Sequence, residues 1–255
     1  MPNKSLGQHW LKDRLILEAI ADCADLDTNE TVLEIGPGLG TLTSVLLNRS
    51  ERVVAVEFDP ELARKLPAQF PGKNLQVDHA DILDYDLNAL PVGYKVVANV
   101  PYYITSKIVQ KLSEANNPPS IAVLLVQKEV AERIAAKPGD MSILAVASQL
   151  YFEAELGPLV PAVYFTPPPK VDSQVVVLTR RSQPLFPDMD EKKFFRVVRA
   201  GFSAKRKKLR SSLAGGLGMD KGDVETLLKE VGINPNDRAE ALSLDDWRRL
   251  AESLS

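Results

Sequence analysis

The sequence predicts an α/β protein with a mostly parallel sheet, followed by a small helical domain. Short apolar, β-branched runs alternate with helical patterns through most of the chain, as in successive βαβ units. A linker at 182–187 contains two prolines and precedes a segment of short helical patterns. With 255 residues, of which 45% are hydrophobic, the chain can bury a full core. We expect one domain over residues 1–183 and a second, all-helical one over 184–255.

Seven runs have the composition of strands, and six of them are Thr31–Ile35, Val53–Glu57, Leu75–Ile82, Tyr94–Ala98, Tyr151–Leu156 and Gln174–Thr179. The seventh, Ile121–Val126, is apolar throughout, which is typical of a strand buried on both faces. Apolar residues at helical spacing predict helices over 15–23, 41–47, 105–113, 127–136, 142–150, 224–231 and 243–254. Asp13, Thr105 and Ser243 precede or begin three of these helices and are expected to cap them.

The cysteine and histidine content argues against a disulfide-bonded protein and against a structural zinc site. The single cysteine, Cys23, cannot form an internal disulfide, and the two histidines, His9 and His79, are far apart in the sequence. No apolar run is long enough to cross a bilayer, and the first residues lack the apolar core of a signal peptide. We therefore expect a metal-free, cytoplasmic protein, and we expect it to be a monomer.

A glycine-rich turn and two downstream acids predict a nucleoside site. Gly36 and Gly38 follow the strand at 31–35, and a helical pattern starts just after them, as in the first βα turn of nucleotide-binding sheets. Glu57 ends the next strand, twenty-one residues after Gly36, where a ribose-binding acid belongs. Asp81 ends the third strand, where it can accept a hydrogen bond from an adenine amino group, and Ile82 can pack on the ring.

The turn itself argues against a phosphate ligand. Pro37 removes one of the backbone N–H donors that a pyrophosphate would use, and Glu34 just before the turn adds negative charge. Negative charge suits the sulfonium and ammonium groups of S-adenosylmethionine. Surface acids at strand ends are a credible alternative for either Glu34 or Glu57 alone, but a poor one for both together with Asp81.

The tetrapeptide Asn99-Val100-Pro101-Tyr102 follows the strand at 94–98 and predicts chemistry on the amino group of a base. The amide oxygen of Asn99 and a carbonyl of Val100 or Pro101 could accept both N–H bonds of an adenine amino group, which would aim its lone pair at a methyl donor. The ring of Tyr102 could stack on a base extruded from its strand.

Two further aromatic residues were open to two interpretations. Phe165 begins the proline-rich segment 165–173, which is either a rigid connector or a pocket rim that holds Phe165 against the base. His9 is either a surface histidine or a residue that lies over a bound small molecule.

The charged residues are strongly segregated. The net charge is −3, but residues 192–212 carry nine lysines and arginines and no acid, so that the remainder of the chain is at −12. A solvated helix face is the usual meaning of a charge run, whereas nine like charges among twenty-one residues favour a nucleic-acid contact. The residues expected to contact RNA phosphates are Lys205, Arg206, Lys207, Lys208 and Arg210.

Taken together, the motifs resemble those of the ribosomal RNA adenine N6,N6-dimethyltransferases, and among them the small-subunit enzymes. The resemblance covers nearly the whole chain and rests on residues 6–11, 34–40, 57, 81, 99–102, 127–130 and 165–173, with 199–213 closer to the small-subunit enzymes. It implies a class I, Rossmann-like methyltransferase fold with a seven-stranded sheet. It also implies that S-adenosylmethionine is bound by His9, Leu11, Gly36, Glu57, Asp81 and Asn99.

The resemblance further implies an activity and a partner: dimethylation of two adjacent adenosines near the 3′ end of small-subunit ribosomal RNA, on an assembling 30S particle. Two positions depart from the family pattern, because His9 and Tyr103 stand where many members have asparagine. A large-subunit methyltransferase of the macrolide-resistance type and a mainly non-enzymatic assembly factor are the alternatives. The intact Glu57, Asp81 and Asn99 argue against loss of activity.

Overall fold

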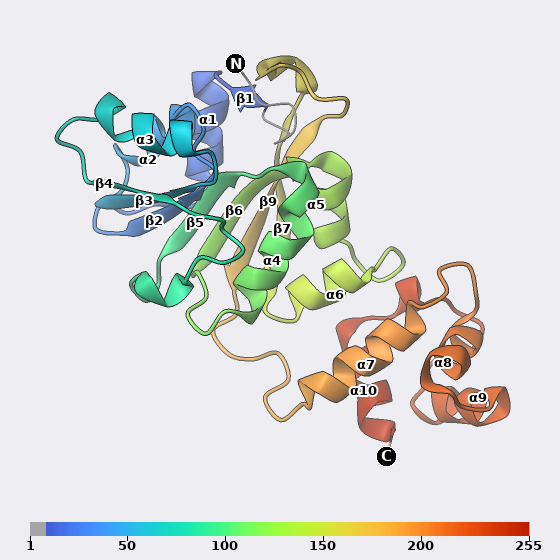
Figure 1. Cartoon of the computed structure of the whole chain (residues 1–255). Helices are drawn as coiled ribbons and strands as arrows, with labels where there is room; N and C mark the ends of the chain where they lie inside the picture. The colour runs from blue at the N-terminus through green and yellow to red at the C-terminus, as the bar shows by residue number, and fades with distance from the viewer. Residues whose placement is uncertain (1–8, 255) are drawn as a thin grey trace. The chain divides into compact units, whose positions relative to one another are not determined.

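The computed structural model of the chain, shown in Figure 1, describes residues 9–254. These residues form two compact units: a sheet unit of residues 9–132 and 152–180, and a helical unit of residues 133–151 and 181–254. The single boundary expected after residue 183 does not reproduce this division, because residues 133–151 cluster with the helical unit and place Met141, Ala145 and Leu150 in its core. That the first domain binds the cofactor and the second binds RNA stays a prediction.

A seven-stranded sheet forms the centre of the sheet unit, in the strand order β4-β3-β2-β5-β6-β9-β7. The strands are β2 (Thr31–Ile35), β3 (Arg52–Glu57), β4 (Leu75–His79), β5 (Lys95–Asn99), β6 (Ile121–Gln127), β7 (Phe152–Val160) and β9 (Ser173–Arg180). The first five strands in the spatial order pair in parallel, whereas β9 is antiparallel to both β6 and β7. The predicted mostly parallel, seven-stranded α/β fold is therefore confirmed.

Strand register brings the predicted site residues to one edge of this sheet. Ile35 at the end of β2 pairs with Val56, Glu57 at the end of β3 pairs with His79 at the end of β4, and β5 ends at Asn99. Because parallel strands share a direction, the turns that follow all four strands lie at the same edge. The first of these turns requires glycine: Gly40 caps α2 with φ +79°, and a Cβ there would lie 2.6 Å from Leu66 Cδ1.

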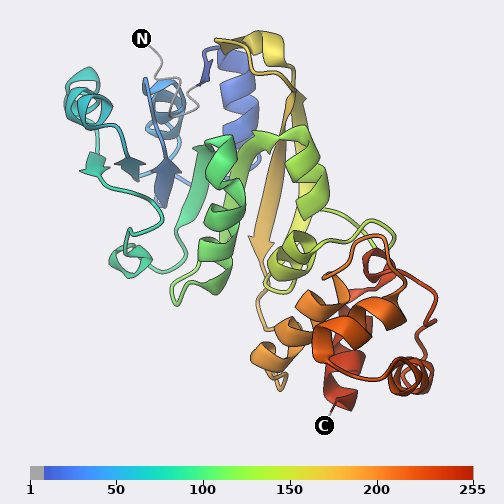
Figure 2. The ribbon, with the colours of Figure 1, turned by 45° about the vertical axis from the view of Figure 1, so that its right-hand side comes forward.

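Helices cover both faces of the sheet, as Figures 1 and 2 show. They are α1 (Arg14–Asp22), α2 (Thr41–Leu46), α3 (Pro60–Lys65), α4 (Thr105–Glu114) and α5 (Lys128–Ile134). On one face, Ile20 of α1 and Leu46 of α2 belong to the same buried cluster as Val53 and Val123 of the strands. The helices α4 and α5 lie on the side that faces the viewer in Figure 1.

Two of the three predicted helix caps are confirmed. Asp13 Oδ1 accepts a hydrogen bond from Ile16 N at 3.1 Å, and Ser243 forms a capping box with Asp246. The prediction for Thr105 is wrong. The N-cap of α4 is Ile104, and Thr105 is the first helical residue.

A pair of two-residue strands lies outside the main sheet. β1 (Trp10–Leu11) pairs antiparallel with β8 (Phe165–Thr166) and sets Leu11 opposite Phe165. Within the proline-rich segment 165–173, the strand is confined to the two residues that precede the prolines. The pairing holds residues 10–11, which line the pocket at the carboxyl edge of the sheet.

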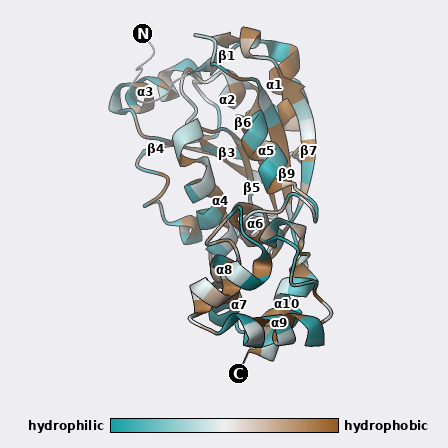
Figure 3. Ribbon diagram, turned by 90° about the vertical axis from the view of Figure 1, so that its right-hand side faces the viewer, coloured by the Kyte–Doolittle hydropathy of each residue, from teal (hydrophilic) through white to brown (hydrophobic). Residues whose placement is uncertain are grey.

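The helical unit consists of α6 (Ile143–Gln149), α7 (Glu191–Gly201), α8 (Leu209–Leu217), α9 (Lys221–Glu230) and α10 (Leu244–Ser253). Phe194 and Trp247 are fully buried in its core. Figure 3 shows hydrophobic and hydrophilic residues side by side along the helices, as expected for helices with one buried face. Among residues 9–254, no helix has the length and apolar character required to cross a bilayer.

Candidate active site

A pocket of about 320 Å³ opens at the carboxyl edge of the sheet. Its lining comes from β1 and from the ends of β2, β3, β4 and β5 with the turns that follow them. The structure thereby brings together most of the predicted site residues, which are His9, Leu11, Gly36, Gly38, Glu57, Asp81, Ile82, Asn99, Pro101 and Tyr102.

The glycine turn and Glu57 form one hydrogen-bonded unit. Gly38 has φ +56°, and its N–H donates to Glu57 Oε2 at 3.0 Å, while Asp59 N donates to Glu57 Oε1 at 2.8 Å. Burial raises the pKa of Glu57, and the bonds from Asp59 and Gly38 oppose that shift. Each carboxylate oxygen retains a second lone pair, so that Glu57 can still accept from a pair of sugar hydroxyls.

Asp81 and Ile82 follow β4 and supply one acceptor and one apolar surface. Asp81 Oδ1 accepts a hydrogen bond from Leu83 N at 2.9 Å, which orients the carboxyl group. Within residues 9–254, no donor reaches the other oxygen, Oδ2. Ile82 is buried and lines the pocket. The pair therefore offers an acceptor for an adenine amino group and an apolar surface for its ring, as predicted.

Two buried polar atoms on pocket-lining residues have no hydrogen-bond partner within residues 9–254: the donor Trp10 Nε1 and the acceptor Glu34 Oε2. Glu34 is 1% exposed, and burial raises its pKa to about 8, an effect that Thr43 opposes and Glu57 reinforces. The negative charge predicted for Glu34 is therefore corrected: at pH 7 the buried group is mostly protonated in the ligand-free protein. Trp10 was not among the predicted contacts, and its position between His9 and Leu11 could have suggested it.

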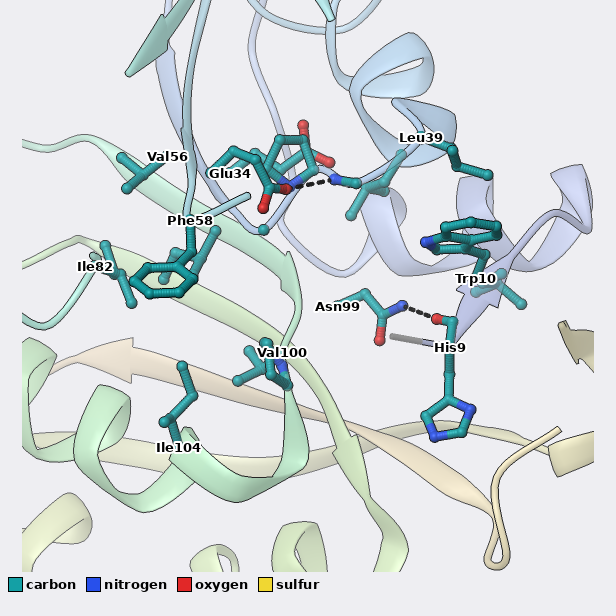
Figure 4. A pocket seen from close by; sticks show the side chains of 18 of the residues that line it. His9, Trp10, Glu34, Leu39, Val56, Phe58, Ile82, Asn99, Val100 and Ile104 are labelled. Atoms are coloured by element: carbon teal, nitrogen blue, oxygen red, sulfur yellow. Dashed lines mark hydrogen bonds between the residues drawn. The ribbon is translucent and has the colours of Figure 1, made fainter. Parts of the chain in front are cut away.

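The tetrapeptide after β5 presents two acceptors. Asn99 Nδ2 donates to the backbone oxygen of His9 at 3.3 Å (Figure 4), which leaves Asn99 Oδ1 without a donor among residues 9–254. The carbonyl of Pro101 already accepts from Ile104 N at 3.2 Å and from Thr105 Oγ1 at 3.5 Å. The described residues offer no donor to the carbonyl of Val100. Of the two carbonyls left open by the sequence, the structure therefore favours Val100.

Tyr102 is held at both its edge and its face. Its hydroxyl lies 2.7 Å from Ser173 Oγ, and its ring stacks on the imidazole of His9 with centroids 5.8 Å apart and planes inclined by 20°. The Nδ1 atom of His9 lies 2.8 Å from the carbonyl oxygen of Pro167. Burial raises the pKa of Tyr102, so that the phenol stays protonated at neutral pH. His9 is thus a pocket residue and not a free surface histidine.

Phe165 does not join the site, and the predicted role for it is corrected. Its side chain is 3% exposed and packs in the cluster that includes Leu11 and Leu17. Two aromatic residues that were not predicted as contacts do line the pocket and are open to solvent: Phe58, 56% exposed, and Tyr103, 64% exposed. Phe58 could have been suggested by its position directly after Glu57.

The remaining predicted contacts have different surroundings. Leu11, a predicted cofactor contact, lines the pocket but is itself buried. Its carbonyl already accepts a hydrogen bond from Thr41 Oγ1 at 2.8 Å. In the helical unit, Arg210 Nη1 pairs with Glu225 Oε2 at 2.7 Å. Hydrogen bonds from Lys229 and then Arg210 lower the pKa of Glu225. No group of three or more potential metal ligands occurs within residues 9–254.

The other four predicted RNA contacts are exposed and form what we call the basic loop, residues 202–208 between α7 and α8. Of its cations, Lys208 Nζ donates to Asn236 Oδ1 at 2.9 Å. Within residues 9–254, Lys205, Arg206 and Lys207 have no acidic partner. The loop therefore presents unneutralised positive charge to solvent.

Comparison with known proteins identifies the family. The family model described as ribosomal RNA adenine dimethylase matches residues 2–255. A curated relative from Dehalococcoides mccartyi is 43% identical over 97% of this chain and 86% of its own length. A second, from Streptococcus equi subsp. zooepidemicus, is 42% identical over 98% and 91%. Both are named ribosomal RNA small subunit methyltransferase A.

Two solved structures are similar over almost the whole chain. The 23S rRNA methyltransferase ErmE superposes with a TM-score of 0.79 at 32% identity, and covers 96% of this chain and 99% of ErmE. A dimethyladenosine transferase from Plasmodium falciparum gives 0.80 at 28% identity, with 95% and 96% covered. On the full-length match of the family model and the identity to its members, this chain belongs to the ribosomal RNA adenine dimethylase family.

Proposed function

We propose that this protein transfers methyl groups from S-adenosylmethionine to N6 of adenosines in small-subunit ribosomal RNA, and that it dimethylates two adjacent adenosines near the 3′ end of that RNA. The observation that carries the proposal is the pair of open acceptors at the pocket, Asn99 Oδ1 and the carbonyl of Val100, within a chain of the adenine dimethylase family. The curated relatives at 42–43% identity are named as small-subunit enzymes. The large-subunit enzyme ErmE is 32% identical.

The pocket residues fit the proposed cofactor. The orphaned donor Trp10 Nε1 matches the carboxylate at the amino-acid end of S-adenosylmethionine. Glu34 Oε2 matches the ammonium, whose positive charge would favour the ionised form of Glu34 when the cofactor is bound. Glu57 would hold the ribose, and Asp81 with Ile82 would hold the adenine. Gly36, Gly38, Leu11 and the backbone of His9 would line the path between the two ends. When bound, the cofactor supplies an electrophilic methyl group on a sulfonium.

Asn99 and Val100 would orient the target amino group. The lone pair of an adenine N6 is delocalised into the ring, which makes this nitrogen a weak nucleophile. Acceptance of its two N–H bonds by Asn99 Oδ1 and the Val100 carbonyl favours a tetrahedral nitrogen with its lone pair aimed at the methyl group. Neither group is basic at neutral pH, so that the proton lost from N6 after transfer leaves to water.

The basic loop would bind RNA phosphates. Lys205, Arg206, Lys207 and Lys208 are exposed, and ribosomal RNA is a polyanion that such a loop attracts over a range set by ionic strength. Arg210 is a weaker candidate than the sequence suggested, because Glu225 already neutralises it. The partner would be the assembling small subunit.

The test is methyl transfer from labelled S-adenosylmethionine to unmethylated small ribosomal subunits and, separately, to deproteinised large-subunit RNA. We expect N6,N6-dimethyladenosine on the small-subunit particle only. Product on the large-subunit RNA would reassign the protein to the resistance-type enzymes. Binding to particles without any product would make it an assembly factor.

A further inference from the structure

The rings of His9 and Tyr102 form a narrow aromatic slot beside the proposed acceptors. Each ring is held by a polar contact at its edge: His9 Nδ1 lies 2.8 Å from the Pro167 carbonyl, and the Tyr102 hydroxyl lies 2.7 Å from Ser173 Oγ. The two planes are inclined by only 20°. Contacts with two different residues therefore hold the two rings nearly parallel.

The slot is slightly too narrow for a base. Stacked bases are about 3.4 Å apart, so that a base between two rings needs about 7 Å between them. The centroids of His9 and Tyr102 are 5.8 Å apart, which is also the largest possible distance between their planes. Entry of a base therefore requires the rings to separate by about 1 Å or more.

Among residues 9–254, the ring that stacks on Tyr102 is that of His9, whereas Phe58 and Tyr103 line the same pocket without a ring contact to Tyr102. Phe165, the aromatic residue that the sequence suggested as a contact of the base, is buried in the core. By contrast, the backbone of His9 is tied to the acceptor residue itself, because its carbonyl oxygen accepts from Asn99 Nδ2 at 3.3 Å (Figure 4). The slot and Asn99 Oδ1 therefore belong to one connected group of residues.

We propose that the target adenine enters between the rings of His9 and Tyr102, with His9 as the second stacking residue of the base site. The inference rests on the proposed adenine methylation at Asn99 and adds a substrate contact to it. Base–aromatic stacking contributes enough to matter for an extruded base, because alanine substitution of one such ring typically costs about 1 to 3 kcal/mol.

Two variants separate stacking from the other contacts of His9. His9→Asn keeps the backbone carbonyl and a polar side chain but removes the ring, whereas His9→Phe keeps a ring and removes the nitrogen that faces Pro167. Steady-state kinetics on unmethylated small subunits gives kcat/KM for each variant. Isothermal titration with S-adenosylmethionine and thermal unfolding report cofactor affinity and folding independently.

We expect His9→Asn to lower kcat/KM about 5- to 150-fold, the range that one lost base-stacking contact predicts. His9→Phe should restore most of that loss, and cofactor affinity should change far less than kcat/KM in both variants. Unchanged or increased kcat/KM in His9→Asn would show that the imidazole merely covers Tyr102 until the base displaces it. Equal losses in both variants would assign the effect to the contact with Pro167. Either result would overturn the proposal.

The activity of the wild-type protein distinguishes a failure of this inference from a failure of the proposed function. If the unaltered protein makes no dimethyladenosine on small subunits, the proposed function fails, whatever the variants of His9 do. If the wild type is active and Asn99→Ala is not, the base site is where we place it. The kinetics of the two His9 variants then test only whether the adenine lies between His9 and Tyr102.

Discussion

The pocket of the sheet unit buries the carboxyl groups of Glu34 and Glu57, whereas the basic loop of the helical unit exposes its cations. In the pocket, both oxygens of Glu57 accept backbone N–H bonds, and Glu34 is 1% exposed. In the loop, Lys205, Arg206 and Lys207 have no acidic partner among residues 9–254 and face water. The first arrangement suits a small ligand that must be oriented, and the second suits a polyanion that must be attracted.

The contrast implies that the two regions should respond to different perturbations. Buried, directional contacts are insensitive to salt, because counterions do not reach them, whereas exposed charges are screened within about 10 Å at 0.1 M salt. Pocket variants should therefore change turnover, cofactor affinity or pH dependence. Loop variants should change RNA affinity and its dependence on salt. A pocket variant that changed the salt dependence of RNA binding, or a loop variant that changed cofactor affinity, would contradict this division.

The largest effect is expected from Asn99→Ala. Removal of the amide oxygen takes away an acceptor that orients N6, and the loss of one such oriented contact typically costs about 10²- to 10³-fold in kcat. Single-turnover methyl transfer to small subunits measures this step, with Asn88→Ala, an exposed asparagine outside the pocket, as the matched control. Wild-type turnover by Asn99→Ala would remove Asn99 from the mechanism.

Glu34 should give the sheet unit a pH-dependent stability. The folded pKa is about 8, above the ordinary value of 4.5, so that between these two values the folded state holds a proton that the unfolded state has lost. The free energy of unfolding should therefore fall as the pH rises through this window, by up to about 1.4 kcal/mol per pH unit, and level off above it. Below the lower value both states are protonated, and the contribution is constant.

Glu34→Gln keeps the shape of the side chain and cannot ionise, so that it should lose this slope and become relatively more stable toward pH 8. Urea unfolding of both proteins at several pH values between 5 and 8 gives the comparison. Glu57, whose pKa is also raised, is present in both proteins, so that the difference between them reports Glu34 together with its interaction with Glu57. Parallel stability curves for the two proteins would mean that Glu34 is ionised in the folded state.

Trp10→Phe should separate cofactor affinity from folding. It removes the buried donor that lacks a partner, so that the ligand-free protein should not lose a hydrogen bond, while S-adenosylmethionine should bind about 10- to 100-fold more weakly if its carboxylate uses that donor. Trp247 Nε1 in the helical unit is a second buried donor without a partner, and Trp247→Phe is therefore the matched control. Equal cofactor affinity in wild type and Trp10→Phe would leave the donor unexplained.

Features of the site that depend on local patterns were predictable, and those that depend on pairing across the chain were not. Glu57, Asp81 and Asn99 could be placed from sequence because Glu57 and Asn99 end short strands and Asp81 follows one closely, and the ends of parallel strands share one edge. The burial of Phe165 depends on its pairing with Leu11, which lies far away in the sequence. Proline content alone shows that a segment is stiff and gives no direction for a side chain.

The ionisation state of Glu34 was likewise not predictable, because it depends on burial that only the packed sheet creates. The same applies to the stack of His9 on Tyr102, which are brought together by the fold of the sheet unit. In the helical unit, the cluster of basic residues was visible in the sequence, but the neutralisation of Arg210 by Glu225 was not, since the two residues lie on different helices.

The smallest effect, and the most specific for the loop, is expected when Lys205, Arg206 and Lys207 are replaced together by glutamine. Each phosphate contact contributes about 0.7 to 0.9 to the slope of log affinity against log salt, so that removal of three charges should flatten the slope for small subunits by about 2. Cofactor affinity should not change, because the pocket is built from the sheet unit alone. Lys221→Gln, which removes one exposed charge on α9, should leave the slope nearly unaltered. A lower cofactor affinity with an unaltered slope would make the loop a structural element and would erase the division between the two regions.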